Sequence, residues 1–188
     1  MKNNLIVSDT NIFLDLYDSN FLKDFFSLPY KISTTMFVFS EIKDDKQLQA
    51  LKPFIDSGKL KIEQLTDDEF SNCLNLSLTT PGDLSITDCS VWQKAKSENA
   101  RLLTNDRKLR KAAEQDNVEV HGILYIFEEL TNHNLIPVEK VEKTLRKLIS
   151  INNRFPKKEA EKLIEKLNQS KKTVKKLKSP DDDSGQGI

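Results

Sequence analysis

The sequence contains little cysteine, histidine or glycine. Among its 188 residues are two cysteines, two histidines and five glycines. Cys73 and Cys89 lie far apart and lack metal-ligand spacing, so they predict buried reduced thiols. No Gly-rich phosphate loop, Ser-His-Asp set or Cys-His pair is present. His121 and His133 are interpreted as turn or surface residues.

Long apolar runs are also missing. No stretch approaches the ~18 apolar residues that a membrane span needs, and the N-terminus lacks a basic segment followed by an apolar signal core. We therefore expect a cytoplasmic protein that makes no use of a membrane. With 37% hydrophobic and 31% charged residues, the chain can bury one ordinary core.

The net charge of zero hides an asymmetry along the chain. Residues 1–136 carry 15 Lys and Arg against 21 Asp and Glu, a balance of −6, whereas residues 137–188 carry 14 against 8, a balance of +6. An acidic body repels a polyanion unless cations neutralise its cleft, while a basic extension can attract one. A solvated helical face also explains the basic extension.

The apolar pattern alternates between strand-like and helix-like segments. Leu5–Ser8 is a continuous apolar run suited to a strand buried on both faces. Further strands are expected near residues 31–33, 61–65, 101–104 and 118–120, with helices between them. This alternation predicts an α/β fold, a three-layer α/β/α sandwich with a mostly parallel central sheet.

Beyond residue 136 the pattern changes to two amphipathic helices, parted by residues 152–156. We expect a first domain over 1–136, a helical extension over 137–170, and a basic then acidic tail over 171–188 that should be disordered.

Four acids recur at comparable places in this pattern. Asp9 follows the first strand, Glu41 lies in the helix after the second, and Asp88 and Asp106 lie near helix starts. Each also has a structural explanation. Asp9 and Asp106 could cap helices, Glu41 could be an exposed helical acid, and Ser85 to Asp88 matches a capping box.

Taken together, the acids predict a cation site at the carboxyl edge of the sheet, where open α/β sheets bind ligands. Several carboxylates packed without a counter-charge are costly, so such a cluster is pulled apart or holds a cation. Hard oxygen ligands with few histidines point to Mg²⁺ or Mn²⁺. Asp83 is a possible fifth acid, although the turn at Pro81 and Gly82 favours a polar residue there.

The sequence resembles a known family at these positions. Ser8 to Asn11 after a strand, Glu41 after the second strand, Leu84 to Asp88 at a helix start, and Leu102 to Asp106 together resemble the PIN domain of the PilT N-terminus type. The VapC toxins of type II toxin–antitoxin systems have this fold. The match covers roughly residues 4–130, and the segment 120–124 followed by two helices resembles a longer PIN subgroup.

The resemblance implies a site and a reaction. It makes Asp9, Glu41, Asp88 and Asp106 the catalytic, metal-binding acids, and it implies metal-dependent endonucleolytic cleavage of RNA. Auxiliary polar positions match as well: Thr10, Asn11, Thr104 and Asn105. Turn formation explains these four equally well.

The resemblance also implies partners: an RNA substrate, a small antitoxin protein and a second copy of the chain. Phosphates of RNA could be bound by cations beyond Asp106, and the lysines of the extension could lengthen this track. The candidate cations are Arg107, Lys108, Arg110 and Lys111, then Lys157, Lys158, Lys171 and Lys172. A solvated helix face is the alternative for each of them.

Two other functions remain open. One is a PIN module without catalytic activity that binds RNA or protein. The other is a phosphatase of the haloacid dehalogenase type, which also places an aspartate after its first strand. That class needs a second acid two residues later, where this chain has Asn11.

Overall fold

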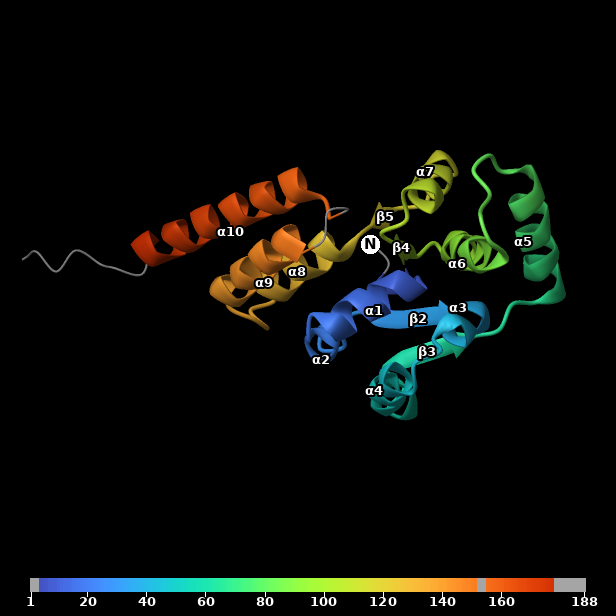
Figure 1. Cartoon of the computed structure of the whole chain (residues 1–188), viewed down its shortest axis with the longest axis horizontal. Coiled ribbons are helices and arrows are strands. Elements are labelled where there is room, and N and C mark those ends of the chain that lie inside the picture. Colours follow the sequence, from blue (N-terminus) through green and yellow to red (C-terminus); the bar gives the residue numbers. More distant parts are fainter. Residues whose placement is uncertain (1–3, 152–154, 178–188) are drawn as a thin grey trace, which may run out of the picture. The chain divides into compact units, whose positions relative to one another are not determined.

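The computed structural model describes residues 4–151 and 155–177. The chain forms two compact units, Met1–Leu130 and Thr131–Ile188. The candidate acids all belong to the first unit, which contains the sheet (Figure 1).

The sheet of the first unit has five strands in the order β3-β2-β1-β4-β5, and every pairing is parallel. The strands are β1 (Leu5–Ser8), β2 (Lys31–Thr35), β3 (Leu60–Glu63), β4 (Arg101–Leu103) and β5 (Val120–His121). The predicted fold class is thereby confirmed. Because β1 is central and parallel to both neighbours, the residues that follow β1, β2 and β4 share one edge.

Helices flank this sheet (Figure 1). The helices between Thr10 and Asn132 are α1 (Thr10–Asp18), α2 (Leu22–Phe25), α3 (Met36–Glu41), α4 (Asp45–Asp56), α5 (Asp67–Thr79), α6 (Ile86–Ser97), α7 (Arg107–Gln115) and α8 (Ile123–Asn132). Among them, α3, α4, α6 and α7 contact strands of the sheet. Helix α6 packs against β1, β2 and β4 as well as against α5 and α7. Its first turn is therefore fixed close to the ends of the central strands.

Local sequence explains where the helices begin. Capping boxes start α5 and α6, with Thr66 paired to Glu69 and Ser85 paired to Asp88. The box predicted at Ser85 is therefore present. Asp44 caps α4 by accepting hydrogen bonds from two backbone N–H groups of its first turn.

Aromatic residues fill much of the core, together with the two cysteines, whose burial was predicted. Trp92 is only 4% exposed, and Phe26 stacks on Phe54 with ring centroids 4.1 Å apart. Cys73 and Cys89 are buried and free. Burial raises the pKa of the Cys73 thiol to about 11 and that of Cys89 to about 12, so both remain protonated at neutral pH.

The second unit contains two helices that pack against each other, α9 (Val138–Ile151) and α10 (Lys157–Leu177). The predicted tail over 171–188 begins inside α10, so its first part is helical rather than disordered. Lysine, leucine and valine are compatible with a helix, and neither proline nor glycine interrupts them before Pro180. Residues 152–154 and 178–188 lie outside the described residues.

The helices that the structure describes include none that is both long and apolar enough to span a bilayer.

Candidate functional site

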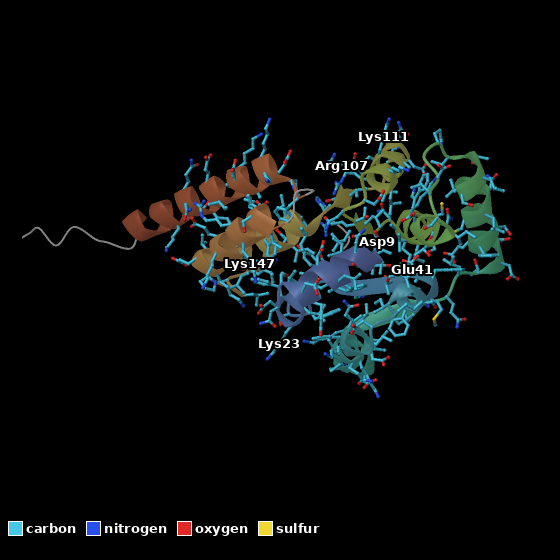
Figure 2. The ribbon with its side chains drawn as sticks, in the orientation of Figure 1. Asp9, Lys23, Glu41, Arg107, Lys111 and Lys147 are labelled. Atoms are coloured by element: carbon cyan, nitrogen blue, oxygen red, sulfur yellow. The ribbon has the colours of Figure 1, made fainter. Side chains whose placement is uncertain are left out.

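The four acids occupy the carboxyl edge of the central strands. Asp9 follows β1 and caps α1, Glu41 is the last residue of α3, Asp88 lies in the first turn of α6, and Asp106 caps α7. Figure 2 labels Asp9 and Glu41 in this region of the first unit. The threonine that opens α1 joins these two acids, because Thr10 donates a hydrogen bond of 2.8 Å from its hydroxyl to Glu41 Oε2.

Asp9 is the most buried of the four acids, with 3% of its surface exposed. Its Oδ1 accepts a hydrogen bond of 2.7 Å from the backbone N–H of Thr10. Its Oδ2 accepts bonds from Asn11 Nδ2 at 2.8 Å and from the Thr104 hydroxyl at 2.7 Å. The carboxylate of Asp9 is therefore oriented by donors from two segments, the first residues of α1 and the loop after β4.

The electrostatic environment of Asp9 is unfavourable to its charged form. The pKa of Asp9 is raised to about 6, chiefly by burial and to a smaller extent by the charges of Asp88 and Glu41, while the hydrogen bonds from Thr104 and Thr10 partly oppose the shift. Three acids are therefore close enough to interact through their charges. A cation bound beside them would remove this cost.

Asp88 and Asp106 also perform the structural roles that the sequence allowed. Asp88 Oδ2 accepts bonds from the backbone N–H and the hydroxyl of Ser85, at 2.9 and 2.8 Å. Asp106 Oδ1 accepts from the backbone N–H groups of Lys108 and Leu109, both at 2.8 Å.

We expect the cap at Asp106 to contribute measurably to stability. Asp106→Ala should lower the free energy of unfolding by about 1 kcal/mol, because two N–H groups lose their acceptor. Asp106→Asn keeps an acceptor and should leave the melting temperature unchanged or slightly higher. Asp44→Ala is the matched control, since Asp44 caps α4 with the same two-bond geometry and should lose a similar amount of stability. Urea unfolding measures all three, and an Asp106→Ala variant as stable as the wild type would contradict the cap.

The donor set suits a hard divalent cation. Within the described residues, Glu41 Oε1, Asp88 Oδ1 and Asp106 Oδ2 accept no hydrogen bond, so each of these three acids keeps one free carboxylate oxygen, whereas both oxygens of Asp9 accept hydrogen bonds. In the same part of the chain, no three His, Cys, Asp or Glu residues are grouped closely enough to hold a metal ion. A group of three direct ligands is not required for Mg²⁺, because this ion usually keeps several waters and is held by only one or two carboxylates. The carboxylate oxygens present here are therefore suitable ligands for it.

The auxiliary polar residues connect the acids to the framework. Thr104 accepts a bond of 3.0 Å from the backbone N–H of Asp106 while its hydroxyl donates to Asp9. Asn11 Oδ1 accepts from the backbone N–H of Asn105 at 3.2 Å. The loop after β4 is thus tied directly to α1.

The four candidate cations of α7 divide into two groups. Arg110 donates to the carbonyl oxygens of Val120 and Thr104, at 2.9 and 3.2 Å, and pairs with Glu114, so its guanidinium supports the ends of β4 and β5. Arg107, Lys108 and Lys111 are exposed, and Figure 2 shows Arg107 and Lys111 on α7.

Outside α7, the other candidates lie as follows. Asp83 is exposed with a φ of +54°, which fits the turn interpretation. Lys157, Lys158 and Lys171 are exposed on α10, where Lys171 pairs with Glu139. The side chain of Lys172 lies outside the described residues.

Sequence reasoning missed several polar residues that support the site. The Thr34 hydroxyl donates to the carbonyl oxygen of Ser8 at 2.7 Å, directly before Asp9. Thr35 and Ser90 share a buried hydroxyl contact of 2.7 Å that links β2 to α6. The only sequence signal for these contacts is the pair of threonines at the end of β2.

A parallel sheet in this order, with acids at the carboxyl edge, defines an α/β protein of the PIN type. The family model described as PIN domain, DUF3368, matches residues 5–169, so the chain belongs to the PIN-domain family, as the resemblance implied. PIN domains are generally nucleases and typically use divalent metals.

The chain is also similar to several solved structures. PAE2754 from Pyrobaculum aerophilum is 15% identical, with a TM-score of 0.51 over 70% of this chain and 98% of that chain. VapBC2 from Rickettsia felis, bound to a promoter DNA fragment, is 20% identical, with a TM-score of 0.46 over 63% of this chain and 98% of that chain. FitAcB from Neisseria gonorrhoeae is 14% identical, with a TM-score of 0.40 over 61% and 95%. No curated protein matches the chain.

Proposed function

We propose that this protein is an endoribonuclease that requires Mg²⁺ or Mn²⁺ and cleaves phosphodiester bonds in RNA. The proposal rests chiefly on Asp9, a buried carboxylate whose pKa is raised to about 6 by burial and by the charges of Asp88 and Glu41. A fold does not need such an arrangement for stability, since isolated buried charge destabilises it. Perturbed acids at a sheet edge are typical of functional sites.

Asp9, Glu41, Asp88 and Asp106 would together hold the cation, some of them through water. When bound, the cation would neutralise charge on the scissile phosphate and lower the pKa of water. The chain itself would orient the ligands. Thr104 and Asn11 aim the Asp9 carboxylate, and Thr10 aims that of Glu41.

Binding of RNA would come from the exposed cations of α7, Arg107, Lys108 and Lys111, which follow Asp106 directly. They lie within a few residues of the acidic site, so a phosphate chain held by them would pass the carboxylates. The exposed lysines of α10 are candidates for further contacts.

We further propose that the protein is the toxin component of a type II toxin–antitoxin system, with a small antitoxin protein as a partner and a second copy as a dimer partner. This part of the proposal rests on the family resemblance. A short reading frame that overlaps or adjoins the gene and encodes an antitoxin-like protein would support it.

A second candidate is a PIN module that binds RNA or protein without cleaving it. One observation favours it: Asp88 and Asp106 each use one oxygen for helix capping, and the described residues gather no group of three ligands.

A cleavage assay separates the two candidates. Glu41→Gln should lower Mn²⁺-dependent cleavage of labelled single-stranded RNA about 100-fold, a loss of about 3 kcal/mol in transition-state stabilisation. Its amide oxygen can still accept the Thr10 hydroxyl, and Glu41 is exposed, so the fold should be unaffected. Asp45→Asn, an exposed acid in the first turn of α4, is the control.

Equal cleavage by wild type and Glu41→Gln would refute the proposed site. If neither protein cleaves RNA while both bind it, the non-catalytic candidate is supported.

A further inference from the structure

Among the residues of the loop after β4, Asn105 forms the most hydrogen bonds to distant parts of the chain. Its Nδ2 donates a hydrogen bond of 2.6 Å to Asp15 Oδ2, four residues beyond Asn11 in α1. Its Oδ1 accepts a bond of 3.1 Å from the backbone N–H of Ile123, the first residue of α8. One exposed side chain therefore joins α1, the loop after β4 and the start of α8.

The position of Gly122 shows how closely this side chain is held. A Cβ atom at Gly122 would lie 2.8 Å from Asn105 Oδ1 and 3.2 Å from Arg110 Nη2. Both atoms are engaged in bonds of their own, to Ile123 and to the Thr104 carbonyl. A side chain at this position would displace the asparagine, so the glycine leaves the space that Asn105 occupies.

Asn105 also has a path to the acidic site. Its backbone N–H donates to Asn11 Oδ1, and Asn11 Nδ2 donates to Asp9. Its neighbours in the chain are Thr104, which donates to Asp9, and Asp106. A shift of Asn105 would therefore move Thr104 and Asp106, and it would also displace the N–H group that donates to Asn11.

We propose that Asn105 is a positioning residue of the carboxylate site. Its bonds to Asp15 and Ile123 hold residues 104–106 against α1 and α8, which keeps the Thr104 hydroxyl and the Asp106 carboxylate aligned with Asp9. This proposal deepens the proposed nuclease function and rests on it. A residue that only shaped the turn would need neither Asp15 nor Ile123, because turn residues bond to their own neighbours.

The pair formed by Asn105 and Asp15 allows a donor–acceptor exchange. Asn105→Asp removes the donor and sets two carboxylates against each other, and Asp15→Asn leaves two amides. Together, Asn105→Asp with Asp15→Asn restores one donor and one acceptor, keeps the net charge, and still offers Ile123 an oxygen. Rescue by the double variant therefore reports this contact rather than general damage.

The experiment compares five proteins with the wild type: Asn105→Ala, Asn105→Asp, Asp15→Asn, the exchanged pair and Gly122→Ala. Asn105→Ala should weaken Mn²⁺ binding, measured by calorimetry, 10- to 100-fold, as the loss of groups that orient ligands usually does. It should lower kcat by a similar factor and leave KM for RNA within about twofold. Gly122→Ala should reproduce both effects, and the exchanged pair should return within about threefold of the wild type. Asn75→Ala, an exposed asparagine on α5, is the control.

A readout without metal separates this proposal from the proposed function. The backbone N–H of Asp106 donates to Thr104 Oγ1, so its hydrogen exchange reports the loop directly. This exchange should be at least about tenfold faster in Asn105→Ala and near the wild-type rate in the exchanged pair. An unchanged rate in Asn105→Ala, or an exchanged pair no better than Asn105→Asp, would overturn the positioning role. A wild type that neither binds Mn²⁺ nor cleaves RNA would instead overturn the proposed function, while the exchange rates still decide whether Asn105 holds the loop.

Discussion

Asp9→Asn is expected to gain about 3 kcal/mol of stability relative to the wild type as the pH rises from about 4 to above 6, because the folded pKa of Asp9 is raised from 3.8 to about 6. The folded state binds the Asp9 proton more tightly than the unfolded state does. Its stabilising contribution is therefore complete below the unfolded pKa and is lost as the pH rises through the folded one. The variant has no proton to lose.

Urea unfolding of both proteins between pH 4 and pH 8 measures this difference. If the amide in Asp9→Asn forms weaker hydrogen bonds than the carboxylate does, the free energy of unfolding of the variant is lower by the same amount at every pH. Its pH dependence is then unchanged. Asp9→Ala is the control, because it also lacks the carboxyl group and should show the same pH dependence from a lower baseline. Parallel stability curves for the wild type and Asp9→Asn would contradict the burial argument.

Arg107→Glu combined with Lys111→Glu should weaken binding of single-stranded RNA 10- to 100-fold at low salt, since two phosphate contacts become repulsive. The slope of log K against log salt should also become shallower by about 1.4, because each lost contact removes about 0.7 for a single strand. Both residues are exposed on α7, so the fold should persist (Figure 2).

Fluorescence anisotropy with labelled RNA at several salt concentrations checks this prediction. Lys23→Glu combined with Lys52→Glu gives the same change of net charge at two exposed positions on α2 and α4. If this control weakens binding as much as the α7 pair does, the effect comes from the total charge and α7 is not the binding surface.

The parts of the fold that depend on local sequence could be predicted. The buried run of β1 and the capping box at Ser85 follow from patterns of a few residues, and both are present. The order of the strands could not be derived in this way, because pairing between β1 and β4 joins residues 95 positions apart, such as Ile6 and Arg101. Periodicity predicted the alternation of strands and helices, and the resemblance to PIN domains predicted the fold class, but neither was used to give the strand order.

The site shows the same division. Position relative to strands and helices was enough to select the four acids, but not the groups that hold them. Arg110 was selected as a phosphate contact because it is basic and close to Asp106, yet it bonds to the carbonyl groups of Val120 and Thr104. Such bonds depend on how β4, β5 and α7 pack, which no spacing along the chain reveals.

The central place of β1 has a consequence for the timing of synthesis. β1 is the first strand to be made, but one of its two neighbours, β4, begins only at Arg101. Until β4 is made, the Asp9 carboxylate lacks the hydrogen bond from the Thr104 hydroxyl. The backbone N–H of Asp9 also lacks its acceptor, the carbonyl oxygen of Leu103. The geometry of Asp9 therefore depends on a side chain that is synthesised 95 positions later, so the carboxylate cannot be fixed while the chain ends before Thr104.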